Sequence, residues 1–244
     1  MKVPGISKLQ IVLAVAMVLA SCTTAPPIPT ATPVPTGVPT LTPKPTFTAT
    51  PNSRFPEGTN IFALDSGSKF AGHVYGQGET AVILANMSYG GEIQWNPFIA
   101  VADKKKFTLI TFNYLQPDYP GAVEAILSVL DRIREAGYKR VVCIGASLGV
   151  SACGSIPHEP EMVGMVMISG PNYGFSVKTS YPKLFIAAAD DPYAKDTKLD
   201  YNDAKEPKQL LLFPGTSVHG TELFSSTFKD QFLQALLDFM NNLP

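Results

Sequence analysis

The stretch from residue 140 to residue 156 reads RVVCIGASLGVSACGSI, and it decides the fold class. Its first part, residues 140–144, is a short apolar run that predicts a buried strand. The pentapeptide Gly145-Ala146-Ser147-Leu148-Gly149 follows directly, and residues 150–156 then predict a short helix. We therefore expect a strand, a tight turn and a helix that packs closely against the strand.

Ser147 stands at the centre of this G-x-S-x-G turn. Glycines on either side permit a strained serine backbone and a close approach of helix to strand, which leaves the hydroxyl exposed. A serine hydroxyl becomes an effective nucleophile only when a base removes its proton and a carboxylate orients that base. Ser147 is thus a candidate nucleophile, while Cys143 and Cys153 nearby are expected to be buried, inert thiols.

Working outward from this stretch, short apolar runs alternate with segments of helical periodicity. Strands are predicted at residues 81–85, 107–112, 162–168, 184–188 and 209–213, and helices at residues 95–106, 120–136 and 221–241. This alternation predicts an α/β fold, a three-layer α/β/α sandwich with a mostly parallel, doubly wound sheet. Functional sites in such sheets lie at the carboxyl ends of the strands.

The chain has three histidines, and only one of them follows a predicted parallel strand. His219 lies in the loop after the strand at residues 209–213, where a catalytic base belongs. His73 falls on an expected edge hairpin, and we interpret it as a surface or packing residue. His158 lies in a proline-flanked turn, on the wrong side of the helix that follows Ser147. His219 is therefore the candidate base.

A carboxylate that orients His219 should lie between Ser147 and His219 in the chain, at the end of another strand. Asp190 and Asp191 both follow the strand at residues 184–188 and precede Pro192. Either could orient the imidazole, while the other would cap the turn or face water. We favour Asp191.

These motifs, in this order and spacing, resemble the α/β-hydrolases over residues 60–244. They are closest in style to the small, lidless esterases similar to dienelactone hydrolase. The motifs are GASLG at 145–149, KLFIAAADDPY at 183–193 and FPGTSVHG at 213–220. The resemblance implies a serine hydrolase of carboxylic esters that uses an acyl-enzyme and no cofactor or metal. Alignment of the family's acid loop on Pro192 again selects Asp191.

Two departures from the family pattern concern the surroundings of the site. The family's oxyanion loop, often His-Gly-x, corresponds here to Asn86-Met87-Ser88. Backbone N–H groups supply such a hole, so Ser88 or Met87 together with Leu148 would serve. The connection at residues 169–182, where larger relatives carry a cap domain, is short. An open, shallow pocket for a small-molecule ester is therefore expected.

The sequence before the domain is typical of a targeting segment followed by a spacer. Lys2 and Lys8 precede an almost unbroken apolar run from Leu9 to Ala20, which is typical of a signal peptide. Leu19-Ala20-Ser21-Cys22 resembles the bacterial lipobox, and this resemblance implies a lipid anchor on Cys22. We predict a lipoprotein signal peptide at 1–22, a Thr/Pro-rich disordered stalk at 23–54 and the hydrolase domain at 55–244. The domain would face the extracytoplasmic side of the cell membrane.

Composition narrows the remaining possibilities. Nineteen Lys and Arg residues against twenty Asp and Glu give a net charge of -1, so the chain lacks the basic field that nucleic-acid binding requires. Three cysteines suit neither a disulfide framework nor a structural zinc site. We expect a monomer. The alternative is a surface binding module that uses this scaffold without turnover, because a fold alone does not imply catalysis.

Overall fold

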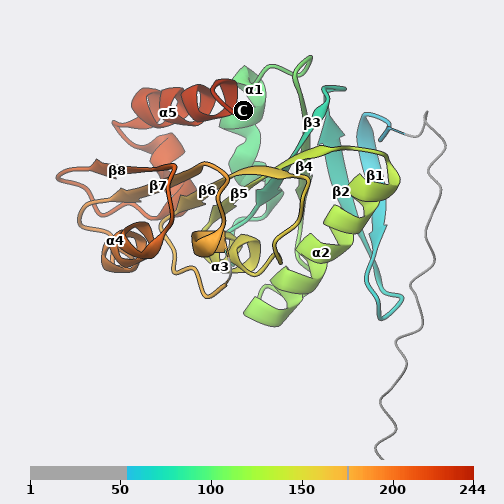
Figure 1. Cartoon of the computed structure of the whole chain (residues 1–244), viewed down its shortest axis with the longest axis horizontal. Coiled ribbons are helices and arrows are strands. Elements are labelled where there is room, and N and C mark those ends of the chain that lie inside the picture. The colour runs from blue at the N-terminus through green and yellow to red at the C-terminus, as the bar shows by residue number, and fades with distance from the viewer. Residues whose placement is uncertain (1–53, 175) are drawn as a thin grey trace, which may run out of the picture. The chain divides into compact units, whose positions relative to one another are not determined.

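The computed structural model describes residues 54–174 and 176–244, which form one eight-stranded sheet with helices on both faces (Figure 1). The predicted signal peptide, Cys22 and all but the last residue of the predicted stalk lie outside the described residues. Among the described residues, no helix is both long enough and apolar enough to cross a membrane.

The sheet is mostly parallel, as the alternation of strands and helices predicts. Its order is β1-β2-β4-β3-β5-β6-β7-β8, with β1 and β2 antiparallel to their neighbours and β3 to β8 parallel. The strands are β1 (Gly58–Ala63), β2 (Lys69–Tyr75), β3 (Thr80–Ala85), β4 (Phe107–Phe112), β5 (Arg140–Ala146), β6 (Met162–Ile168), β7 (Lys183–Ala188) and β8 (Lys208–Phe213).

Five helices cover the two faces of this sheet. They are α1 (Asn96–Val101), α2 (Tyr119–Glu135), α3 (Leu148–Gly154), α4 (Ala194–Asp203) and α5 (Lys229–Asn241), with short 3-10 helices η1 (Glu92–Trp95), η2 (Ser176–Lys178) and η3 (Gly220–Ser225). Helices α2, α3 and α4 lie on one face and α1 and α5 on the other (Figure 1). Because both faces are covered, every residue of β3, β4 and β7 is buried. The predicted three-layer α/β/α architecture is confirmed.

The predicted helix at residues 95–106 is shorter in the structure. Helix α1 ends at Val101, and Ala102 is extended. The side chain of Asp103 then accepts a hydrogen bond from the Lys105 N–H at 2.9 Å, and its carbonyl accepts from the N–H groups of Lys106 and Phe107. Asp103 thus closes a turn that competes with the helix, so the lysines lie in a tight turn before β4.

One further helical prediction needs correction, and one helix was missed. The helix predicted over residues 221–241 is divided into η3 and α5, because Ser226 is extended and its hydroxyl accepts from the Phe228 N–H at 3.1 Å. Helix α4 was not predicted, since its sequence AKDTKLDYND buries only Ala194 and Thr197 and carries no apolar stripe.

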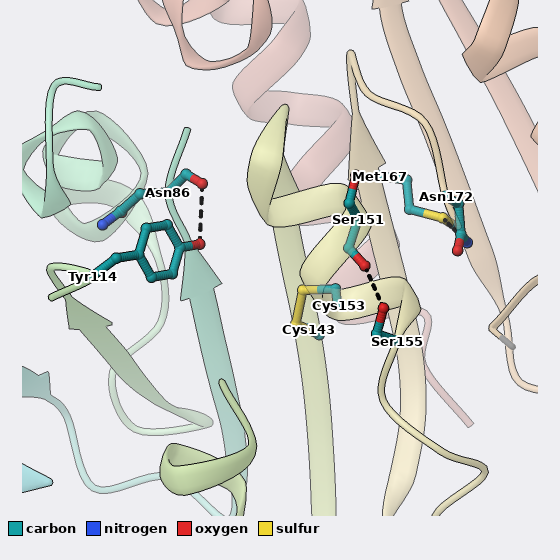
Figure 2. Close-up of a disulfide and its surroundings, with 8 residues drawn as sticks. All are labelled: Asn86, Tyr114, Cys143, Ser151, Cys153, Ser155, Met167 and Asn172. Atoms are coloured by element: carbon teal, nitrogen blue, oxygen red, sulfur yellow. Dashed lines mark hydrogen bonds between the residues drawn. A yellow bond between two sulfur atoms is a disulfide. The ribbon is translucent and has the colours of Figure 1, made fainter. Parts of the chain in front are cut away.

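Cys143 and Cys153 are joined in a disulfide, so the expectation of two free thiols is wrong (Figure 2). Cys143 lies on β5 and Cys153 on α3, with their Cα atoms 6.0 Å apart. The chain reverses direction at Ser147. The four residues from Cys143 to the turn span roughly 13 Å along the strand, and the six residues from the turn to Cys153 span roughly 9 Å back along the helix. The two cysteines therefore come to lie side by side.

Candidate active site

Ser147 occupies the sharp turn between β5 and α3. Its backbone has φ 52° and ψ -113°, a conformation that non-glycine residues rarely adopt, and its side chain is partly exposed. The Ser147 N–H donates to the carbonyl of Ile168 on β6 at 2.9 Å. A Cβ atom on Gly149 would come within 2.3 Å of the Ala85 carbonyl oxygen, so only glycine lets α3 approach β3 this closely.

Asp191 and His219 form a hydrogen-bonded pair at the ends of β7 and β8. The Nδ1 atom of His219 lies 2.9 Å from Oδ2 and 3.2 Å from Oδ1 of Asp191. The Asp191 side chain has no exposed surface, and its Oδ1 also accepts from the Tyr193 N–H at 2.8 Å. An ionised carboxylate only accepts hydrogen bonds, so Nδ1 of His219 carries a proton and Nε2 is left as the basic nitrogen of the neutral ring.

The neighbouring acid and the other two histidines lie elsewhere. Asp190 is exposed, and its N–H donates to the carbonyl of Thr216 at 3.1 Å. His158 is exposed. His73, on β2, lies 3.0 Å from a carboxylate oxygen of Glu92. Of the two aspartates considered, Asp191 is the one that contacts His219.

The loop that carries His219 packs against the turn that carries Ser147. A Cβ atom on Gly220, the residue after His219, would lie 2.5 Å from Sδ of Met87 and 3.6 Å from Cβ of Ala146. Segments that follow β3, β5 and β8 therefore meet at one point. Within the described residues, the Ser147 hydroxyl and His219 share no hydrogen bond.

The candidate oxyanion residues lie beside this point. Met87 is buried, Ser88 is exposed, and Leu148 is the first residue of α3. Backbone N–H groups in the first turn of a helix have no partner within the helix. Among the described residues, the N–H groups of Met87, Ser88 and Leu148 donate to no protein acceptor. All three therefore remain candidate donors to an oxyanion.

Asn86 fixes the start of the loop that holds Met87 and Ser88. Its buried amide accepts from Trp95 Nε1 at 3.0 Å and donates to the Phe112 carbonyl, while its own carbonyl accepts from the Tyr114 hydroxyl at 3.1 Å (Figure 2). Burial raises the pKa of Tyr114, so its hydroxyl stays neutral and remains a donor. The amide thus ties the loop after β3 to the end of β4.

Sequence reasoning missed the polar side chains that hold the His219 loop. The His219 N–H donates to Oε2 of Glu222 at 3.1 Å, and the Tyr89 hydroxyl donates to Oε1 of the same carboxylate at 3.1 Å. Nearby, Thr221 Oγ1 donates to Gln94 Oε1 at 2.6 Å. Desolvation and then the Glu222 carboxylate raise the pKa of Tyr89. The spacing of His219 and Glu222, three residues apart before a helical turn, is the signal that could have revealed Glu222.

No metal site is visible in the part of the chain that the structure describes, because no three His, Cys, Asp or Glu side chains are grouped to hold an ion. The chemistry that these residues offer is instead that of a hydroxyl, an imidazole and a carboxylate at the ends of neighbouring strands.

No protein-family model and no curated protein matches this chain. Solved structures do. The esterase domain of a Rhodothermus marinus protein has a TM-score of 0.61 at 13% identity and covers 76% of this chain and 98% of its own. The esterase EaEST from Exiguobacterium antarcticum has a TM-score of 0.62 at 11% identity, with coverages of 76% and 100%. An alpha-beta serine hydrolase homologue from Coxiella burnetii has a TM-score of 0.60 at 12% identity and covers 76% of this chain and 98% of its own. The chain therefore has the α/β-hydrolase fold.

The disulfide should stabilise the segment around Ser147. A bridge with a sequence separation of 10 restricts the unfolded chain by about 2–3 kcal/mol. We expect the double variant Cys143→Ala/Cys153→Ala to lose that much free energy of unfolding in urea titrations. Reductant should lower the unfolding midpoint of the wild type and leave that of the double variant unchanged, which makes the variant its own control. An unchanged wild-type midpoint under full reduction would contradict the bridge.

Proposed function

We propose that this protein is a serine hydrolase of carboxylic esters in which Ser147 is the nucleophile, His219 the base and Asp191 the orienting acid. The observation that carries the proposal is the partly buried Asp191–His219 pair, 2.9 Å apart, on a loop that packs against the turn of a serine whose backbone is held at φ 52°. The α/β-hydrolase fold shared with the esterases named above supports it. The fold alone does not imply the reaction, so the proposal depends on these side chains.

The reaction proceeds in two halves. Oγ of Ser147 attacks the acyl carbon while Nε2 of His219 takes the hydroxyl proton, and Asp191 stabilises the imidazolium through Nδ1. The alcohol then leaves with the proton from Nε2, and an acyl-enzyme remains. Water attacks this ester by the same route and releases the acid. The hydrogen bond between Ser147 and His219, absent from the described residues of the free protein, forms when substrate binds, since such hydrogen bonds tighten in the reactive complex.

The oxyanion that forms at each step needs donors already in place. In the proposal the N–H of Leu148 and that of Met87 or Ser88 donate to it. Main-chain donors require no particular side chain, so the Asn86-Met87-Ser88 sequence serves although it differs from the family pattern. The buried amide of Asn86 holds this segment in position. The proposed machinery uses no cofactor and no metal.

We also propose that the enzyme works as a monomer outside the cytoplasm, anchored to the membrane by a lipid on Cys22, on small-molecule esters. The lipobox-like sequence and the Thr/Pro-rich segment after it motivate this location. The Cys143–Cys153 disulfide supports it independently, because structural disulfides persist in oxidising compartments and are rare in the cytosol.

The first test is covalent labelling by a fluorophosphonate probe. Wild-type protein should be labelled, and Ser147→Ala should lose both labelling and turnover of p-nitrophenyl acetate. The matched control is Ser217→Ala, which removes an exposed hydroxyl from the His219 loop and should leave both signals intact. Labelling that survives in Ser147→Ala would refute the nucleophile, and an unlabelled, inactive wild type would favour a binding module.

The length of the acyl group gives a separate prediction for the wild type. The value of kcat/KM should fall as the acyl group of the p-nitrophenyl ester is lengthened from acetyl to palmitoyl, because a short loop at residues 169–182 provides little apolar wall.

The second test separates the two aspartates. Asp191→Asn should lower kcat on the order of 10⁴-fold, because an amide in place of the carboxylate stabilises the wrong imidazole tautomer. Asp190→Asn makes the same change of carboxylate to amide at an exposed neighbour and should lower kcat far less. Equal losses in kcat, or a larger loss at Asp190, would overturn the assignment.

The third test concerns the anchor. Cys22→Ala should abolish incorporation of radiolabelled palmitate and block processing of the signal peptide, because the thiol is the site of acylation. The double variant at Cys143 and Cys153 should still incorporate the label. Palmitate on the Cys22→Ala protein would show that the anchor is assigned wrongly.

A further inference from the structure

The tyrosines of this protein divide sharply by exposure. The sequence has nine of them, and five are buried or half-buried. Four expose between 40% and 70% of their surface, and we call these four the tyrosine rim: Tyr89, Tyr119, Tyr173 and Tyr193. Large exposed apolar surface bordered by polar residues commonly marks a binding site.

Each member of the tyrosine rim follows a different parallel strand. Tyr89 comes after β3, Tyr119 after β4, Tyr173 after β6 and Tyr193 after β7. Carboxyl ends of parallel strands meet at one edge of a sheet, which we call the carboxyl edge. Each exposed tyrosine therefore lies on a connection that leaves the edge carrying Ser147 and His219.

Two members of the rim lie beside the candidate base. The ring of Tyr193 is centred 5.1 Å from the imidazole of His219, at an interplanar angle of 38°. The hydroxyl of Tyr89 donates to the Glu222 carboxylate, which also accepts from the His219 N–H. Tyr193 and Tyr89 therefore border the surroundings of His219.

The other two members lie at the far end of α3. The rings of Tyr119 and Tyr173 are 6.0 Å apart and meet edge to face, and the Tyr119 hydroxyl lies 2.7 Å from Oγ of Ser155, the residue that ends this helix. Helix α3 starts next to Ser147 and is seven residues long, which corresponds to roughly 10 Å. A short acyl group on Ser147 does not reach this pair, so a ligand that contacts both pairs is an extended molecule.

The main chain beside Tyr173 is held in place before any ligand arrives. Next to Tyr173, the Asn172 N–H donates to Oδ2 of Asp200 at 2.7 Å, and the Gly174 N–H donates to Oδ1 of Asn172 at 3.0 Å. The exposed ring of Tyr173 thus stands on a fixed main chain (Asn172 is drawn in Figure 2). Fixed aromatic rings give large contact areas at a small cost in conformational entropy.

The charge of the carboxyl edge selects among extended ligands. Residues 86–95, 113–118, 169–174, 189–193 and 214–219 contain four Asp or Glu residues and no Lys or Arg. An anionic polymer or an anionic lipid surface would therefore be repelled. A tyrosine combines an apolar face with a hydroxyl, and sugar rings match it with a C–H face and hydroxyl groups at their edge.

We infer that the tyrosine rim binds a neutral oligosaccharide chain and presents an O-acyl ester on that chain to Ser147. This inference rests on the proposed function, since it names the alcohol half of the ester as a saccharide. Stacking of remote sugar units on Tyr119 and Tyr173 supplies binding energy far from the reacting bond.

Kinetic comparison of two substrates tests the inference. The first is a partially O-acetylated hexasaccharide. One such hexasaccharide is tested from each of three β-1,4-linked series, those of glucose, xylose and N-acetylglucosamine. The second substrate is p-nitrophenyl acetate, which is too small to span the rim. Tyr173→Ala should lower kcat/KM for the best hexasaccharide by about two- to tenfold more than for p-nitrophenyl acetate. Tyr173→Trp keeps an aromatic face and should retain the hexasaccharide rate. The control Leu199→Ala, which removes a side chain 51% exposed on α4, should leave both rates unchanged.

A binding measurement separates failure of the inference from failure of the proposed function. NMR titration measures how the same hexasaccharides bind to the Ser147→Ala variant. If the wild-type protein hydrolyses no ester, saccharide binding that Tyr173→Ala weakens would support the saccharide site and refute the proposed function. Turnover of p-nitrophenyl acetate without binding or hydrolysis of any hexasaccharide would refute the saccharide site alone. Equal losses on both substrates in Tyr173→Ala, or activity that appears only on emulsified neutral triglyceride, would also overturn it.

Discussion

Close contact of main chain with main chain around Ser147 is the constraint on which the candidate site depends. A Cβ atom on Gly145 would lie 2.3 Å from the Gly149 carbonyl oxygen, and one on Gly170 would lie 2.5 Å from the Ser147 carbonyl oxygen. The Gly149 carbonyl belongs to α3, and the Ser147 carbonyl accepts the hydrogen bond from the Val150 N–H that starts this helix, so neither can shift without disturbing α3. A strained serine backbone costs about 1–3 kcal/mol, and it persists here because the surrounding structure leaves it no alternative. The disulfide from β5 to α3 closes the same segment covalently.

The base is held in a different way. His219 lies on a loop whose position depends on side-chain hydrogen bonds, with Asp191 on the imidazole and Glu222 on the main chain. Tyr89 and Gln94 extend these contacts to the segment after β3, which also contains the proposed oxyanion donors. Each such bond contributes modestly to stability, about 0.5–1.5 kcal/mol, but together they fix the distance between two loops that are remote in sequence.

The fold could be predicted from sequence because its signals are local. Apolar runs and the turn at 145–149 specify the six parallel strands, and their alternation with helices specifies the layers. The turn at Asp103 and the break at Ser226 were missed, since a single side chain decides each against the periodicity of its neighbours. The disulfide was missed because pairing depends on how the chain reverses between Cys143 and Cys153. Contacts of Glu222 with Tyr89 join residues far apart in the chain, and no local pattern predicts them. The order of strands in space places Asp191 against His219, whereas sequence left two aspartates open.

The order in which the chain is made has a consequence for the site. Strand β8 pairs only with β7, and the loop with His219 follows β8 near the end of the chain. An incomplete chain that emerges from a ribosome or a translocation channel therefore contains the serine turn long before it contains the base. Synthesis is slow compared with local folding, so a nascent domain passes through stages in which the hydroxyl has no partner to remove its proton. Under the mechanism proposed here, the domain can hydrolyse an ester only once the part that contains His219 has been made and has folded. Truncated products that lack His219 are therefore inactive.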